Sequence, residues 1–248
     1  MESSGFLDIH SHVCPSGDDG AQSFAEAVEL CRMAAATGTR LLFATPHVLR
    51  CPDEDYLLTA EREAAVRATH ALLAEEAAAF GLELRLGWEL GPGTPLNSGY
   101  ERVQLEGTRA VLVEAPGAWY GLEPQLYFDV LVGECLRIER QGLVPIVAHP
   151  ERCASIIASP KLALVLAEHG WPLQVNASSL TGGHGTGAWQ TAWTLLRLGL
   201  YDFIGSDGHD TEMRPPRLDL AYELVASELC GARADALFGG AAFARIAL

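Results

Sequence analysis

The chain has 248 residues, of which 49% are hydrophobic, and it carries a formal net charge of −15 at pH 7. This length and apolar content suit one α/β domain with a full core, and we expect a single domain over residues 1–248. The negative charge disfavours nucleic-acid binding. No apolar run is long enough to span a bilayer, and the N-terminus lacks the pattern of a signal peptide. We therefore expect a cytoplasmic protein without membrane insertion.

The cysteines exclude several further classes of protein. Six cysteines are spread along the chain without a Cys-x-x-Cys pair, which fits reduced thiols better than a disulfide framework or a zinc ribbon. None is followed by arginine six positions later, so the phosphate-binding loop of a cysteine-dependent phosphatase is missing. Lys161 is not preceded by the glycines that a P-loop requires.

Short apolar runs alternate with longer helical patterns along the chain, and the first predicted element is a strand. The predicted strands are Phe6–His10, Arg40–Thr45, Leu84–Glu89, Ala110–Glu114, Val144–His149, Leu173–Asn176 and Phe203–Ser206. The predicted helices are Ser23–Ala36, Asp53–Phe80, Pro124–Gln141, Pro160–Glu168, Gly187–Leu198 and Leu218–Leu229. Strands alternating with helices predict an α/β fold with a parallel sheet. Seven strands favour a closed or nearly closed barrel over the alternative, an open doubly wound sheet.

Histidines and carboxylates collect where the predicted strands end. The side chains at or just past successive strand ends are His10, His12, His47, Glu89, Glu114, His149, Asp207 and His209. In a parallel barrel these ends open onto one face, where barrel active sites lie, so we expect the side chains to converge. Of the remaining histidines, His70 and His169 lie in helical patterns and are expected at the surface, while His184 sits in a Gly-rich loop and has no assigned role.

The residue types at these positions indicate metal binding. Imidazole and carboxylate groups without thiolates suit manganese, iron, zinc or magnesium. With Asp19 the candidates number nine, which is too many for one ion and fits two or three ions with a carboxylate bridging a pair. Two ions roughly 3.5–4 Å apart can activate a hydroxide and hold a phosphoryl oxygen.

Two arginines extend this pattern toward a phosphoesterase. Arg152 ends the sequence His-Pro-Glu-Arg, and Arg214 stands in Met-Arg-Pro-Pro-Arg. A guanidinium group binds phosphate oxygens in a bidentate manner. Either arginine could instead form a structural salt bridge, for example with Glu151 or Asp219.

Taken together, these motifs resemble those of the PHP (polymerase and histidinol phosphatase) superfamily. The opening segment Asp8–His12, followed by Asp18-Asp19-Gly20, is similar to the start of that superfamily. More narrowly, the chain resembles the bacterial PHP-type protein-tyrosine phosphatases of capsule and exopolysaccharide gene clusters over nearly its whole length. The other segments that carry the resemblance, in the family's order, are Ala44–His47, Gly87–Leu90, Val111–Glu114, Ala148–Arg152, Gln174–Leu180, Ser206–His209 and Arg214–Pro216.

The resemblance implies a PHP-type distorted (β/α)7 TIM-like barrel with three metal ions, usually manganese. One ion would take His10, His12, Glu89 and Asp207, a second Glu89, Glu114 and His149, and a third Asp19, His47 and His209. Arg152 and Arg214 match the family's phosphate-binding arginines, so these two and the bridging Glu89 are the catalytic candidates. The implied reaction is hydrolysis of phosphotyrosine by a metal-activated hydroxide. The implied partner is the Tyr-rich tail of a bacterial tyrosine kinase that drives polysaccharide export.

The chain departs from the family's pattern in two places. Gly208 and Asp210 stand where the family usually has Ala or Met and Asn, and we expect the added charge of Asp210 to weaken anion affinity. The segment Ala115–Pro124 differs from the family's Phe-rich stretch. Its Trp119 and Tyr120 either stack on an aromatic substrate or pack within the loop.

Two alternative functions stay open at this point. A histidinol-phosphate phosphatase, or another small phosphomonoesterase of the superfamily, would use the same metals with a different pocket. A catalytically idle PHP domain that binds phosphoprotein would act as a regulatory module. The native substrate protein, the physiological metal and self-association into a homo-oligomer are not indicated by the sequence.

Overall fold

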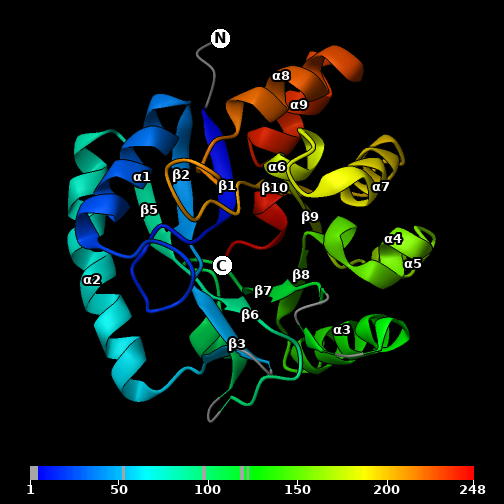
Figure 1. The fold of residues 1–248 in the computed structure, drawn as a ribbon, viewed down its shortest axis with the longest axis horizontal. Helices are drawn as coiled ribbons and strands as arrows, with labels where there is room; N and C mark the ends of the chain where they lie inside the picture. The colour runs from blue at the N-terminus through cyan, green and yellow to red at the C-terminus, as the bar shows by residue number, and fades with distance from the viewer. Residues whose placement is uncertain (1–4, 52–53, 97–98, 118–119, 122) are drawn as a thin grey trace.

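The computed structural model describes residues 5–51, 54–96, 99–117, 120–121 and 123–248. Its strands are β1 (Phe6–Ser11), β2 (Thr39–Ala44), β3 (His47–Cys51), β4 (Glu54–Tyr56), β5 (Glu83–Leu86), β6 (Glu89–Leu90), β7 (Ala110–Glu114), β8 (Val144–Ala148), β9 (Leu173–Asn176) and β10 (Phe203–Gly205). Its helices are α1 (Phe24–Ala36), α2 (Ala60–Ala79), α3 (Pro124–Glu139), α4 (Ala154–Ala158), α5 (Leu162–Glu168), α6 (Ala177–Leu180), α7 (Gly185–Arg197), α8 (Asp219–Glu228) and α9 (Gly231–Phe238). In Figure 1, α1 and α2 lie outside β2 and β5, while α3, α4, α5 and α7 lie outside β8 and β9.

Two hydrogen-bonded sheets together make one ring of strands. The first sheet has the order β1-β2-β5, and the second has the order β10-β9-β8-β7-β6-β3-β4. After a gap of two residues, β2 is followed by β3 and β5 by β6, so each pair acts as one interrupted strand. The ring closes between β1 and β10, where Asp207 N donates to His10 O (2.9 Å) and His12 N donates to Gly208 O (2.8 Å). The result is the distorted barrel of seven strands that the sequence predicted.

The interruptions differ from the prediction, which treated residues 84–89 as one continuous strand. Pro46 has no N–H to donate to a ladder, so pairing stops between β2 and β3. In the neighbouring interrupted strand, a Cβ on Gly87 would lie 2.4 Å from Leu105 Cδ2, so that position has no room for a side chain. The missing donor of Pro46 therefore accounts for the first gap, whereas Gly87 still donates from its backbone N to Ala44 O (2.8 Å).

The gaps also change where two site residues stand. The prediction had His47 just past one strand and Glu89 at the end of the next, but each begins a short strand, β3 or β6. The two residues are register partners in the parallel β3–β6 ladder. Their side chains therefore start side by side on one face of the barrel.

The helices match the predicted ones with local differences. The helix predicted from Asp53 begins only at Ala60, because the Thr59 side chain accepts a hydrogen bond from Arg62 N (3.1 Å) and caps the helix there. Residues 54–56 instead form β4, antiparallel to β3, and Asp53 lies outside the described residues. The helices α4, α6 and α9 were not predicted, and each is eight residues or shorter.

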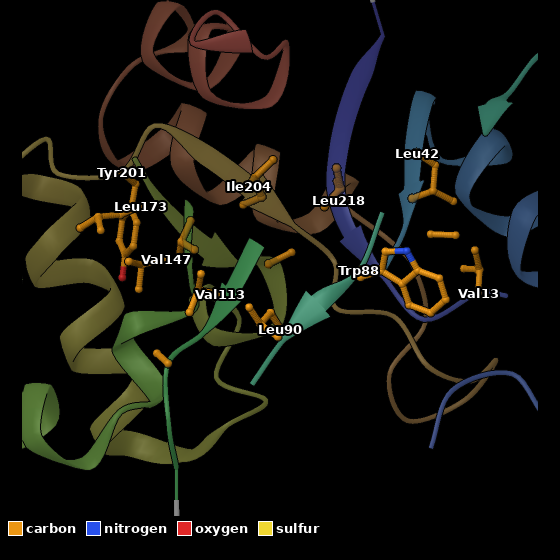
Figure 2. Close-up of a cluster of buried hydrophobic side chains, with 14 of the residues drawn as sticks. Val13, Leu42, Trp88, Leu90, Val113, Val147, Leu173, Tyr201, Ile204 and Leu218 are labelled. Carbon is orange, nitrogen blue, oxygen red and sulfur yellow. The ribbon is translucent and has the colours of Figure 1, made fainter. Parts of the chain in front are cut away.

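Two groups of buried apolar side chains hold the barrel. The larger one lies between strands and helices and contains residues such as Leu42, Val113 and Val147; Figure 2 shows it extending from Val13 and Trp88 to Leu173 and Tyr201. The smaller one joins side chains from strands on different sides of the ring, which can meet only inside it; it includes Ile9, Phe43, Leu112, Ile146 and Phe203. Side chains alternate along a strand, so the residue two positions after Leu112, Glu114, also faces the barrel interior.

None of the helices in the described ranges has the length and apolar character needed to cross a membrane.

Candidate metal centre

The barrel brings the nine predicted ligand side chains together at one end. Eight of the nine residues are at most 8% exposed, and the Asp19 side chain is 45% exposed. Their nitrogen and oxygen atoms form four overlapping groups, each with its atoms within 4.8 Å of one another. The groups are His12, Asp19, His47 and His209; His10, Glu89 and His149; His10, His12 and Asp207; and His47, Glu89 and Glu114.

Glu89 lies at the centre of this arrangement. Its Oε2 atom is 3.2 Å from His10 Nε2, 3.3 Å from His12 Nε2 and 3.1 Å from His47 Nδ1. Its Oε1 atom is 2.9 Å from His149 Nε2. One fully buried carboxylate therefore contacts four imidazole rings, which is the position a bridging ligand needs.

Asp207 connects the histidines to the two predicted arginines. Its Oδ1 atom is 3.5 Å from both His10 Nε2 and His12 Nε2. Its Oδ2 atom accepts hydrogen bonds from Arg152 Nη1 (2.6 Å) and pairs with Arg214 Nη2 (2.9 Å). The salt bridges considered for these arginines with Glu151 and Asp219 are absent from the described residues, because both guanidinium groups point to Asp207 instead.

The outer part of the site contains Asp19, His47 and His209. Asp19 Oδ1 lies 3.5 Å from His47 Nε2 and 3.3 Å from His209 Nε2. The neighbouring Asp18 has a different role: its Oδ1 accepts from Gly20 N (3.2 Å) and its Oδ2 accepts from His47 N (2.9 Å). Asp18 thus fixes the loop and the strand that carry the outer ligands, while Ser23 caps α1.

Arg62 on α2 ties the same two segments together. Its guanidinium donates to Ser16 O (3.0 Å) and Ser16 Oγ (3.1 Å) in the loop before Asp19. It also donates to His47 O (2.8 Å) and Tyr56 O (2.7 Å). Sequence reasoning missed this residue, because its position within a helix shows no sign of the four acceptors that the fold brings to it.

Glu114 and His149 line the opposite side of the site. Glu114 Oε2 accepts a hydrogen bond from Tyr120 OH (3.0 Å), and the Tyr120 side chain is only 6% exposed. Of the two predicted roles for Tyr120, this packing favours the one within the loop. Trp119 lies outside the described residues.

The backbone is unusual at two of the candidate ligands. His149 has φ of 33° and Asp207 has φ of 52°, and among the described residues no other non-glycine residue has positive φ. Such conformations are disfavoured for residues with a Cβ and concentrate at functional sites. His149 directly follows β8, and Asp207 lies two residues past the end of β10, so both stand at the carboxyl ends of barrel strands.

Burial and mutual contact set the charges of these groups. Burial alone would raise the pKa of Glu89, but His10 and His47 hold that pKa well below its usual range. Burial likewise opposes ionisation of Asp207, yet Arg214 and His10 keep the pKa of Asp207 well below normal. Burial lowers the pKa of His149 to about 4, and the adjacent Arg152 adds to this shift. Burial raises the pKa of Glu114 well above its usual value, and the charge of Glu89 raises it further. Glu89 and Asp207 are therefore held as carboxylates and His149 as neutral imidazole, the forms that bind metal. Against the opposing effect of burial, nearby carboxylates raise the pKa values of His10 and His12, so these rings and Glu114 must lose protons when metal binds.

The unpaired polar atoms of the site fit a group of divalent cations. Within the described chain, several buried ligand atoms make no hydrogen bond of acceptable geometry: Glu89 Oε2, His12 Nδ1, His47 Nδ1, His149 Nδ1 and His209 Nε2. Buried polar atoms normally have partners. Glu89 Oε2 lies 3.1 Å from His47 Nδ1, and His209 Nε2 lies 3.3 Å from Asp19 Oδ1, so these atoms are close enough to share a cation. The set of nitrogen and oxygen donors, without sulfur, suits manganese, iron, zinc or magnesium.

The two departures from the family's pattern have local explanations. A Cβ on Gly208 would lie 2.7 Å from Pro216 Cα, so the loop leaves no space for a larger residue. The Oδ1 atom of Asp210 accepts hydrogen bonds from the backbone N–H groups of Glu212, Met213 and Arg214. Asp210 therefore shapes the loop that presents Arg214; its expected effect on anion affinity stays a prediction.

The remaining histidines are not among the candidate metal ligands. The prediction that His70 lies at the surface was wrong: it is 9% exposed and belongs to the buried face of α2 with Val66 and Leu73, where burial lowers its pKa. His169 is exposed as predicted and stacks on Trp171. His184 Nε2 is 2.8 Å from Ser178 Oγ.

A cavity of about 240 Å³ opens onto the candidate centre. Its lining combines metal-ligand types, both arginines and one aliphatic residue: Asp19, His47, Leu49, Glu89, Glu114, His149, Arg152, Asp207, His209 and Arg214. A cavity with this lining can receive a small anionic group against cations and guanidinium groups together.

The distorted barrel and its buried His/Asp/Glu cluster are those of a metal-dependent hydrolase of the PHP type. Residues 6–246 match the family model described as "Capsular polysaccharide synthesis, CpsB/CapC". The chain therefore belongs to the CpsB/CapC family, as the sequence motifs predicted.

Individual relatives agree with this membership. The chain is 30% identical over 215 residues to tyrosine-protein phosphatase YwqE of Bacillus subtilis, a match that covers 84% of this chain and 79% of the relative. It superposes with a TM-score of 0.71 and 28% identity on a structure from a study of YwqE from B. subtilis and CpsB from Streptococcus pneumoniae, described as metal-dependent tyrosine phosphatases, covering 92% of this chain and 89% of the other. Histidinol phosphate phosphatase from Lactococcus lactis shares the fold at 14% identity and a TM-score of 0.53, with 93% and 94% of the two chains covered.

Replacing Arg62 by methionine should destabilise the metal-free protein by about 3 kcal/mol or more, because four acceptors lose a charged donor. Urea unfolding in the presence of a chelator measures this change, and limited proteolysis should show faster cleavage in the loop before Asp19. Arg67→Met on the same helix is the matched control. It loses one exposed pair with Glu63 and should change stability by under about 0.5 kcal/mol. Equal stability of the two variants would contradict the role given to Arg62.

Proposed function

We propose that this protein is a metal-dependent protein-tyrosine phosphatase that acts in capsule or exopolysaccharide synthesis. The observation that carries the proposal is the convergence of four imidazole rings on the Glu89 carboxylate, with Arg152 and Arg214 meeting beside it at Asp207. Membership of the CpsB/CapC family and the tyrosine-phosphatase relatives support the substrate class. The implied substrate is phosphotyrosine in the Tyr-rich tail of a bacterial tyrosine kinase. A cytoplasmic location stays a prediction.

We assign the ligands to three ions, for which manganese is the proposed metal. His10, His12, Glu89 and Asp207 would hold the first, Glu89, Glu114 and His149 the second, and Asp19, His47 and His209 the third. The contacts of Glu89 with both His10 and His149 support its place between the first two ions. His12 also lies within reach of the third set, so it borders two positions.

The protein's own residues would bind and orient the phosphate. Divalent ions, when bound, lower the pKa of a coordinated water and neutralise phosphoryl charge. Arg152 and Arg214 would add guanidinium donors for the phosphoryl oxygens, where negative charge is spread in the transition state. The more exposed Asp19 and Arg214 mark the side from which substrate enters. Phenolate, with a pKa of about 10, leaves without a strong acid, and we nominate no proton donor.

The proposal is tested by stripping the protein of metal and assaying phosphotyrosine peptide, phosphoserine peptide and histidinol phosphate with manganese added back. We expect release of phosphate from the phosphotyrosine peptide alone, and only with the metal. Preference for histidinol phosphate would replace the tyrosine-phosphatase proposal by the alternative enzyme. Metal binding without turnover of any substrate would indicate an idle regulatory domain or a different phosphoester.

Glu89→Ala should reduce turnover by about 10³-fold or more. The substitution removes a ligand shared by two ions, so both ions should be bound less well. Steady-state assays and a manganese titration measure the effect, and circular dichroism checks that the fold is kept. Glu75→Ala, an exposed glutamate on α2, is the control and should behave as wild type. A folded Glu89→Ala protein with normal turnover would refute the assignment.

Arg152→Ala should raise KM for phosphotyrosine peptide by roughly 10- to 100-fold, the loss expected for one charge-assisted interaction with phosphate. The change in kcat should be smaller. Arg217→Ala is the matched control, because Arg217 pairs with Asp219 at 2.6 Å away from the cavity lining. Unchanged KM and kcat in Arg152→Ala would remove this residue from the site.

A further inference from the structure

Two buried amides connect one candidate ligand of the first ion to another. His10 Nδ1 lies 3.1 Å from Gln174 Oε1, Gln174 Nε2 donates to Asn176 Oδ1 at 2.8 Å, and Asn176 Nδ2 donates to Asp207 Oδ2 at 2.7 Å. None of the four side chains is more than 2% exposed. Solvent therefore cannot replace any of these partners, and each hydrogen bond depends on the next.

The direction of this chain of hydrogen bonds is determined at one end. Asp207 Oδ2 lies 2.6 Å from Arg152 Nη1 and 2.9 Å from Arg214 Nη2, and a carboxylate oxygen paired with two guanidinium groups only accepts hydrogen bonds. Asn176 must therefore turn its NH2 group to Asp207 and its oxygen to Gln174. Gln174 must then turn its NH2 group to Asn176 and its oxygen to His10.

The consequence falls on the imidazole ring of His10. An amide oxygen beside Nδ1 requires a hydrogen on that nitrogen, because two acceptors cannot face each other. This leaves Nε2 as the ring atom that faces Glu89 Oε2 and Asp207 Oδ1, at 3.2 Å and 3.5 Å. Metal-binding histidines generally need such a partner on the second nitrogen to fix tautomer and ring orientation.

At Gly205, strand β10 leaves no space for a side chain beside these hydrogen-bonded groups. A Cβ on Gly205 would lie 2.7 Å from both Gln174 Nε2 and His10 Cβ. A side chain at that position of β10 would therefore displace the amide or the ring. The glycine keeps the two groups in contact across neighbouring strands.

We propose that Gln174 and Asn176 are positioning residues that connect the Asp207 carboxylate to Nδ1 of His10 and fix the tautomer of that ring, so that two ligands of one ion are oriented together. This inference rests on the metal centre of the proposed function. It adds that two ligands of the first ion are oriented before any metal binds, by amides that do not themselves contact the ion.

The test compares manganese affinity in the metal-stripped wild type and three variants. Gln174→Met keeps the size of the side chain but removes both the acceptor and the donor of the amide, and it should weaken binding of at least one ion by about 10- to 100-fold. Gln174→Glu retains an acceptor for His10 Nδ1 but loses the donor to Asn176 Oδ1, so the link to Asp207 is broken and manganese binding should also weaken. Val175→Ala is the matched control: its side chain points from the same strand into the outer core, and its metal affinity should stay at the wild-type value.

A second readout follows the His10 ring itself. In zinc-loaded protein labelled with 15N-histidine, the Nδ1–H signal of His10 should exchange slowly in wild type and Val175→Ala, and rapidly in Gln174→Met. A purely structural role would make Val175→Ala and Gln174→Met weaken metal binding alike.

The outcomes separate this inference from the proposed function. A wild-type protein that binds no manganese would overturn the metal centre itself. A wild type that binds manganese, with unchanged affinity and exchange in folded Gln174→Met, would overturn the relay alone. If Gln174→Met does not fold, a folded Gln174→Glu protein with wild-type manganese affinity would overturn it, because the donor to Asn176 Oδ1 is lost in that variant.

Discussion

The pairing of the first barrel strand with the last is the contact on which the site depends. Two backbone hydrogen bonds, from Asp207 N to His10 O and from His12 N to Gly208 O, join segments almost 200 residues apart in the chain. They close the ring and bring the His10-x-His12 pair against Asp207. Without this closure, the carboxyl ends of the strands would fan apart and the ligands could not share a centre.

Closing the ring concentrates charge on side chains that are buried at the base of the cavity. A buried carboxylate is unfavourable unless it is paired, and Glu89 and Asp207 are paired in different ways. Glu89 is surrounded by imidazole groups, whereas Asp207 divides its two oxygens between imidazole on one side and guanidinium and amide groups on the other. These contacts offset the free-energy cost of burying the two carboxylates, and the same contacts keep them ionised. Because an ionised carboxylate is the form that binds a cation, burial and metal binding depend on the same neighbours.

The residues that hold the ligands in place differ between the exposed and the buried side of the site. At the exposed side, Arg62, Asp18 and Asp210 hold loops through backbone atoms, and these loops carry Asp19, His47 and Arg214. At the buried side, support comes from side-chain amides on β9. Loops at the mouth of a barrel lack ladder hydrogen bonds and need such side-chain contacts to stay in place. The backbone of a strand residue is already positioned by the ladder, so only the orientation of its ring or amide has to be fixed.

The sequence by itself determined the barrel, the nine candidate ligands and the two arginines, because strand ends and ligand types are local features and the parallel topology places all strand ends on one face. The sequence predicted only part of the strand breaks at Pro46 and Gly87 and of the late start of α2. Proline marks a missing hydrogen-bond donor, but the short strand β3 that follows it depends on pairing with β4 and β6. The burial of His70 and the clamp of Arg62 were not readable at all, since each depends on partners that lie far away in the chain. The tertiary structure alone decided that both arginines meet at Asp207 and that two amides link Asp207 to His10, because the direction of a hydrogen-bonded chain is set by the charge at its end and not by the spacing of its members.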